Sequence, residues 1–182
     1  MNRDMELVKP NQPKTITDNK NPGGARLYIK NSSIYDIAVI EVDDPSIGVA
    51  KDRPDGVKLV DKLIKVNDRV TYLIELKGKG FAYSHKQIWD TIDYMRQTEP
   101  LTLYVCDKDT VLAYSVSHNG RVPASLNNTL LRKLSKLNKI KRQLYEYITF
   151  VRCVPKCSAS YVFTPKPGGQ MLNAPNCPLI IR

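Results

Sequence analysis

The stretch VKLVDKLIKVNDRVTYLIELK, residues 57–77, decides the fold of this chain. It contains two runs, VKLVDKLIKV (57–66) and VTYLIELK (70–77), whose β-branched and aromatic residues are typical of β-strands. The three residues between the runs, NDR, predict a short hairpin loop, and a loop of that length pairs Val66 with Val70. The stretch therefore predicts two antiparallel strands with a defined register.

This register brings three charged side chains to one face of the hairpin. Asp61 lies opposite Glu75, and Lys77 follows two residues later on the same face. Two carboxylates that face each other across neighbouring strands repel, which destabilises the pair by some tenths of a kcal/mol unless a positive charge lies between them. A divalent cation would supply that charge.

The opposite face supports the register because it is apolar. Its members are Val60, Ile64, Val66, Val70, Tyr72, Ile74 and Leu76. A slip by one residue would bury the acids instead. The charged face also carries Leu59, Leu63 and Leu73, so we expect a helix to cover part of it. A sheet buried on both faces is typical of an α/β fold.

With these residues in place, segment 26–153 resembles the PD-(D/E)xK nuclease superfamily, which has the restriction-endonuclease-like fold. In that family an acid on one strand and an acid-x-Lys on the next hold Mg²⁺, and a Gln or similar residue in the following helix completes the site. The run YLIELKGKGFAYSHKQIWDTI is similar to the family's passage from the second catalytic strand into that helix. The resemblance implies Asp61 and Glu75 as metal ligands, with Lys77 and Gln87 completing the catalytic set.

The resemblance also implies an α/β fold in which helices flank a mixed β-sheet, and a metal-dependent endonuclease that uses Mg²⁺ or Mn²⁺. Phosphodiester hydrolysis needs a nucleophilic water and stabilisation of the charge that develops in the transition state. Mg²⁺ prefers oxygen ligands and takes only one or two carboxylates. Lys77 would orient the water and stabilise the anionic transition state.

Two of these residues have alternative interpretations. Ser84-His85-Lys86-Gln87 fits a helix capping box, in which Gln87 reaches back to the Ser84 amide, and this role is as well supported as the catalytic one. Asp55 follows Pro54 and so matches the first half of the family motif in letters. The hairpin register places Asp55 beyond the second strand, and Asp61 fits better.

The family often adds an upstream acid, for which Glu41 and Asp43 are the candidates. They lie in an expected strand, whereas the family usually carries this acid on a helix. An acidic strand end that runs into a turn at Asp44-Pro45 is the preferred interpretation.

The formal net charge of +10 predicts an anionic partner. From residue 126 onward, leucines recur at helical spacing, at Leu130, Leu134, Leu137 and Leu144. Basic residues occupy the rest of this expected helix, and those expected to contact nucleic acid are Arg132, Lys133, Lys136 and Lys139. DNA is favoured over RNA as the substrate. An ordinary solvated face is the alternative for this helix.

The composition predicts one domain with two extensions. Residues 1–24 are polar, contain three prolines and are expected to form a flexible arm. The nuclease-like domain is expected at 25–154, followed by a loop-rich extension at 155–182. No secretory signal or membrane-length apolar run is found, so we expect a cytoplasmic protein without a membrane partner.

The remaining expected elements flank the hairpin. Strands are expected at 26–29, 37–42, 101–106, 111–115 and 148–154, with a helix at 85–97. The four cysteines, Cys106, Cys153, Cys157 and Cys177, form no persuasive zinc set and are expected to be reduced thiols.

A homodimer and a role in defence are further expectations from the resemblance. The alternative to a nuclease is a catalytically inactive nuclease-fold module that binds nucleic acid or serves as an adaptor.

Overall fold

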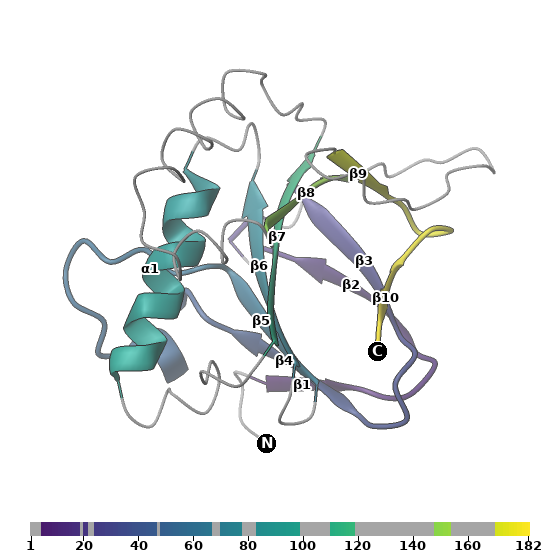
Figure 1. Ribbon diagram of the computed structural model, residues 1–182, viewed down its shortest axis with the longest axis horizontal. Helices are drawn as coiled ribbons and strands as arrows, with labels where there is room; N and C mark the ends of the chain where they lie inside the picture. Colours follow the sequence, from purple (N-terminus) through teal and green to yellow (C-terminus); the bar gives the residue numbers. More distant parts are fainter. Residues whose placement is uncertain are drawn as a thin grey trace.

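The computed structural model describes residues 5–18, 20–21, 24–46, 48–66, 70–77, 83–98, 110–118, 148–153 and 170–182 (Figure 1). Its elements in chain order are β1 (Met5–Val8), β2 (Pro13–Thr17), β3 (Arg26–Asn31), β4 (Ile37–Glu41), the short 3₁₀-helix η1 (Gly48–Ala50), β5 (Lys62–Val66), β6 (Val70–Lys77), α1 (Ser84–Gln97), β7 (Thr110–His118), β8 (Ile148–Cys153), β9 (Gln170–Asn173) and β10 (Leu179–Ile181).

The strands form two mixed sheets. The larger sheet has the order β1-β4-β5-β6-β7-β8-β9, and its strands are antiparallel from β1 to β6 and parallel from β6 to β9. The smaller sheet has the order β10-β3-β2. Figure 1 shows α1 on one side of the large sheet and the smaller sheet on the other. The fold class is therefore α/β with a helix-flanked mixed sheet, as predicted.

The predicted hairpin register is confirmed. Val66 pairs with Val70, and Lys62 pairs with Ile74. One further step along the same ladder brings Asp61 beside Glu75. Asp61 lies just before β5, where its carbonyl accepts a hydrogen bond of 3.1 Å from the Val42 N–H.

Two apolar clusters bury the two faces of the hairpin. Toward the smaller sheet, the even-numbered residues Ile64, Val66, Tyr72, Ile74 and Leu76 pack with side chains that include Ile16, Leu27, Ile29, Leu179 and Ile181. Toward α1, the cluster includes Leu59, Leu63, Leu73, Ile88, Ile92 and Met95. The helix expected over the charged face is therefore present. A sheet, and not a second helix, covers the other face within the described part of the chain.

Val60 was expected on the face of Ile64, and this prediction is wrong. Val60 belongs to the cluster under α1. It precedes β5, so strand pairing does not impose the two-residue alternation there. Its N–H donates to Thr91 Oγ1 at 2.8 Å, which ties this segment to the helix.

The expected flexible arm at 1–24 is also corrected. Residues 5–8 form β1, which pairs with β4, and residues 13–17 form β2, which pairs with β3. Val8 and Ile16 are buried, and they anchor their strands in the core. The segment looked unstructured because strands this short need only one buried residue each.

The expected loop-rich extension at 155–182 contains two strands of the fold. β9 pairs with β8, and β10 pairs with β3. Asn173 joins the two sheets, because its side chain accepts from the Tyr28 N–H at 2.7 Å and donates to the Tyr28 carbonyl at 2.9 Å. The domain boundary expected at residue 154 is therefore wrong.

The other expected elements are present where the structure describes them. The strands at 26–29, 37–42, 111–115 and 148–154 correspond to β3, β4, β7 and β8, and the helix at 85–97 corresponds to α1. The strand at 101–106 and the basic helix from residue 126 lie outside the described residues. In the part of the chain that can be described, no helix has the length and apolar character needed to cross a bilayer.

Candidate metal and catalytic site

Asp61 is held at the edge of the site by backbone groups. Its Oδ2 accepts a hydrogen bond of 2.6 Å from the Leu76 N–H on β6. Burial raises the pKa of this carboxyl to about 6, and the Leu76 hydrogen bond only partly opposes that rise. The hairpin thus carries Asp61 against the strand that contains Glu75, as the sequence predicted.

Glu75 is an acidic side chain buried in the core. It is only 1% exposed, on the face of β6 that α1 covers. Oε1 pairs with Lys77 Nζ, while Oε2 is buried and has no hydrogen-bond partner among the described residues. Burial, followed by the charge of Asp61, raises the pKa of Glu75 to about 8 despite the nearby Lys77. A buried acceptor left unsatisfied costs about 1–3 kcal/mol, so we expect Glu75 Oε2 to bind a partner such as a ligand.

Lys77 and Gln87 meet beside Glu75. Lys77 Nζ donates to Gln87 Oε1 as well as contacting Glu75, and Gln87 Nε2 donates to the Leu59 carbonyl at 3.3 Å. The N-cap of α1 is Tyr83, with no side-chain cap hydrogen bond. The capping-box interpretation of Gln87 is therefore wrong, and its side chain turns toward β6 instead.

The first turns of α1 are fixed to the segment before β5. Thr91 is buried, and its hydroxyl donates to the Gln87 carbonyl at 2.7 Å while accepting from Val60 N–H. Because Gln87 also binds Leu59, the helix holds this segment at two neighbouring residues. These contacts position Asp61 and Gln87 relative to β6.

Asp55 lies away from the site. It is exposed, in a turn just before Gly56, whose φ of 81° is readily adopted only by glycine. These positions agree with the hairpin register, in which Asp61 and not Asp55 lies beside Glu75.

The upstream acids do not join the paired carboxylates directly. Glu41 pairs in register with Lys62 and forms an ion pair with it, which places Glu41 on the opposite face of the sheet. Asp43 forms ion pairs with Arg53 and, at 3.3 Å, with Lys20. Glu41 therefore cannot join Asp61 and Glu75, whereas, besides burial, the charge of Asp43 contributes to the raised pKa of both carboxyls. The strand end runs into a turn, as preferred.

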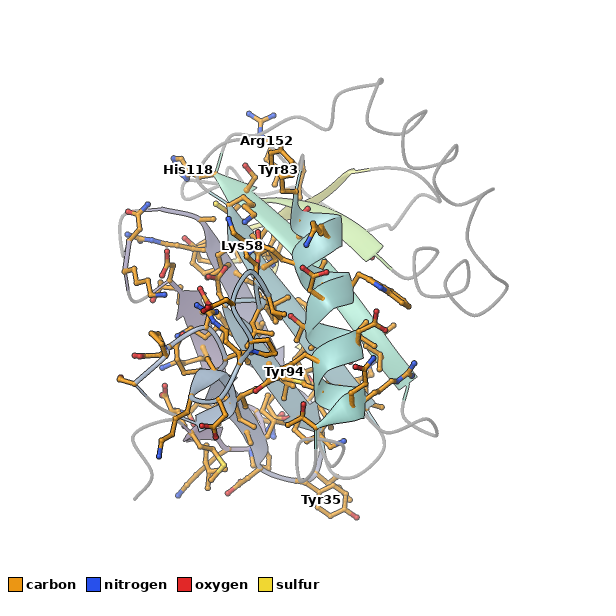
Figure 2. The ribbon with its side chains drawn as sticks, turned by 90° about the vertical axis from the view of Figure 1, so that its left-hand side faces the viewer. Tyr35, Lys58, Tyr83, Tyr94, His118 and Arg152 are labelled. Atoms are coloured by element: carbon orange, nitrogen blue, oxygen red, sulfur yellow. The ribbon has the colours of Figure 1, made fainter. Side chains whose placement is uncertain are left out.

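Residues on the parallel strands β7 and β8 continue the row of Glu75 and Lys77, and they were not predicted from the sequence. Glu75 pairs with Ser115 on β7, and Lys77 pairs with Ser117, which in turn pairs with Arg152 on β8. Paired residues of neighbouring strands lie on the same face, so these side chains continue the charged row. Figure 2 shows Tyr83, His118 and Arg152 gathered at this end of the sheet, with Tyr35 at the opposite end.

The donor set fits a hard divalent cation. Within the described ranges, no three His, Cys, Asp or Glu side chains come together as a metal-binding cluster. Mg²⁺ needs only one or two carboxylates, because it keeps several waters. Asp61 and Glu75 provide that number, and the unpartnered Oε2 of Glu75 is an oxygen suited to such an ion.

The other expected site residues are only partly described. The basic residues Arg132, Lys133, Lys136 and Lys139 lie outside the described residues. Among the described residues, Cys153 and Cys177 form no disulfide, and Cys153 Sγ lies 3.5 Å from His118 Nδ1. Cys106 and Cys157 are not described.

The chain matches no family model, no curated protein sequence and no solved structure at a significant level.

Proposed function

We propose that this protein is a metal-dependent endonuclease of the PD-(D/E)xK type, which hydrolyses phosphodiester bonds of a nucleic acid with Mg²⁺ or Mn²⁺. The observation that carries the proposal is Glu75, a fully buried carboxylate with one unpartnered oxygen beside Asp61 and Lys77. The net charge of +10 supports an anionic substrate, with DNA favoured over RNA.

Asp61 and Glu75 would hold the cation. When bound, it would act as a Lewis acid toward the phosphoryl oxygens and stabilise the charge that develops on them. Glu75 lies on β6, and Asp61 directly precedes β5 and accepts a hydrogen bond from the β6 backbone, so the backbone positions the two carboxylates relative to each other. Such preorganisation is what electrostatic catalysis requires.

Lys77 is the cationic group of the site. It is shared between Glu75 and Gln87, so its ammonium group is held in place on both sides. We assign to Lys77 the orientation of the attacking water and stabilisation of the anionic transition state. Gln87 is a positioning residue, because its amide anchors Lys77 to α1 and reaches the Leu59 carbonyl.

The second candidate is a catalytically inactive nuclease-fold module that binds nucleic acid or serves as an adaptor. One observation favours it: Lys77 already pairs with Glu75, so part of the carboxylate charge is neutralised without a cation. A cytoplasmic location, a homodimer and a role in defence are the further parts of the proposal, and they follow from the resemblance and the sequence.

The test is cleavage of plasmid, linear duplex and single-stranded DNA and of RNA, with Mg²⁺, with Mn²⁺ and with chelator. The proposal expects cleavage of at least one substrate that requires the cation and is lost in Glu75→Gln. Asp55→Asn is the matched control, because it removes an exposed carboxylate outside the site and should leave cleavage unchanged. Binding without cleavage in every metal would favour the inactive module.

A further inference from the structure

Three buried donor atoms beside the candidate site have no hydrogen-bond partner in the described part of the chain. They are Ser115 Oγ, Ser117 Oγ and Arg152 Nε. Both serines are 0% exposed. Buried polar groups in proteins are nearly always hydrogen-bonded, and a group of neighbouring exceptions indicates a missing partner.

The strand register places these donors in an ordered array. Ser115 is level with Glu75, whereas Ser117 and Arg152 are level with Lys77. The row Lys77, Ser117, Arg152 crosses three adjacent parallel strands at their carboxyl ends, and all three side chains lie on the face that α1 covers. With strands about 4.8 Å apart, Arg152 lies about 10 Å from the Lys77 position along the sheet.

The chemistry of this row selects an oxyanion. Lysine and arginine side chains only donate hydrogen bonds, and serine donates one. An arginine Nε–H is part of a planar fork of donors that matches phosphate oxygens. A partner with several acceptor oxygens and negative charge would satisfy the array and balance its two cations, and a cationic ligand would not.

We propose that Ser117 and Arg152 form a phosphate-binding subsite, which holds the phosphodiester next to the one cleaved at Lys77. This inference rests on the proposed function, since it takes the substrate to be a nucleic acid strand. The strand then runs across the carboxyl ends of β6, β7 and β8, from the acids toward Arg152. Ser117 lies between the two phosphates and donates its hydroxyl to the bound backbone.

The subsite predicts an unusual effect of mutation on stability. A serine with a structural role loses a hydrogen bond when it becomes alanine, and the protein is destabilised. An unpartnered buried hydroxyl costs free energy, so Ser117→Ala should leave the melting temperature of the ligand-free protein unchanged or raise it. The same substitution should weaken substrate binding.

The experiment measures fluorescence anisotropy of labelled duplex and single-stranded DNA with the full-length protein in chelator, over a range of salt concentrations. Cleavage by the wild-type protein is measured in parallel with Mg²⁺. The variants are Arg152→Gln, Arg152→Lys and Ser117→Ala. The control is Lys9→Gln, which removes an exposed cation beyond the far end of β1. Inorganic phosphate is used as a competitor, to separate a free-anion site from a phosphodiester site.

Arg152→Gln should weaken DNA binding roughly 10- to 100-fold. The slope of log affinity against log salt concentration should become shallower by about one, because one phosphate contact is lost. Arg152→Lys should have the salt slope of the wild type, because the charge is kept, but a lower affinity for DNA, because lysine lacks the fork of donors. Ser117→Ala should weaken binding roughly two- to tenfold with no loss of melting temperature. Lys9→Gln should bind like the wild type.

The contrary outcomes distinguish failure of the phosphate subsite from failure of the proposed function. If the wild-type protein cleaves DNA and Arg152→Gln binds DNA normally, the subsite is overturned and the proposed function stands. Wild-type protein that neither binds nor cleaves any nucleic acid would overturn both. A lower melting temperature in Ser117→Ala with unchanged DNA affinity would assign the serine a structural role. Inorganic phosphate that binds through Arg152 without displacing DNA would assign a free-anion site instead.

Discussion

The two faces of β6 are buried to nearly the same degree and yet differ in chemistry. Ile74 and Leu76 face the smaller sheet at 0% and 7% exposure, and Glu75 between them faces α1 at 1%. The first face consists of apolar side chains in contact with one another. The second places an unpartnered carboxylate oxygen beside a lysine. A buried carboxylate lowers stability, and such groups are common at functional sites, which supports the proposed role of Glu75 in binding a cation.

The largest expected effect is on catalysis. Lys77→Ala should lower the cleavage rate about 10²- to 10³-fold, because it removes the cation that faces the transition state. Lys51→Ala removes an exposed lysine and is the matched control. Single-turnover cleavage rates measure the effect, and a reduction of less than about tenfold would remove Lys77 from the transition state.

Substitutions on the two faces of β6 should change the free energy of unfolding in opposite directions. Ile74→Ala should destabilise the protein by about 2–5 kcal/mol, because it leaves a cavity between the sheets. Glu75→Gln should stabilise the cation-free protein near pH 8, since it removes a buried charge while keeping the shape. Urea denaturation in chelator measures both. Equal destabilisation by the two substitutions would show that Glu75 serves the fold as Ile74 does.

The pH dependence should follow from the raised pKa of Glu75. This carboxyl has a pKa of about 8 when folded, against 4.5 for the free group. Between these values the folded state binds more protons than the unfolded state, so stability falls as pH rises. We expect a loss on the order of 2–4 kcal/mol between about pH 5 and about pH 8.5 in chelator. Glu75→Gln should remove most of this dependence of stability on pH. If the pH dependence is unchanged in this variant, the titrating group is another residue.

The smallest effect should come from the acid that matches the family motif in letters only. Asp55→Asn should change cleavage less than about twofold, because Asp55 is exposed in a turn outside the site. Asp61→Asn should lower the affinity for the divalent cation while the fold survives. If Asp55→Asn abolished cleavage and Asp61→Asn did not, the site would be misplaced.

The hairpin and its pair of acids could be predicted because two independent signals agreed. The length of the loop and the apolar alternation both fixed the pairing of Val66 with Val70. β1, β2, β9 and β10 could not be predicted in this way, because a short strand with one or two buried residues leaves little periodic pattern. Their places depend on contacts with distant segments, such as those of Asn173 with Tyr28.

Beyond the hairpin register, the arrangement of the candidate site could be predicted only where its residues are close in sequence. Glu75 and Lys77 stand two residues apart, and the spacing itself shows that they share a face. The sequence allowed Gln87 either a capping or a catalytic role, and the structure shows only that its side chain turns toward Lys77 and does not cap α1. Ser117 and Arg152 were missed because their significance lies in pairing across parallel strands and in the partners that they lack.

The most direct test of the central claim is the melting temperature during Mg²⁺ titration, compared between the wild-type protein and Glu75→Gln at about pH 8. At a hundredfold excess over Kd, bound cation stabilises the folded protein by about 2.7 kcal/mol, or roughly 5–10 °C for a chain of this size. We expect that rise in the wild type, and a higher but Mg²⁺-independent melting temperature in Glu75→Gln. Identical responses of the two proteins to Mg²⁺ would contradict the assignment of Glu75 as a metal ligand.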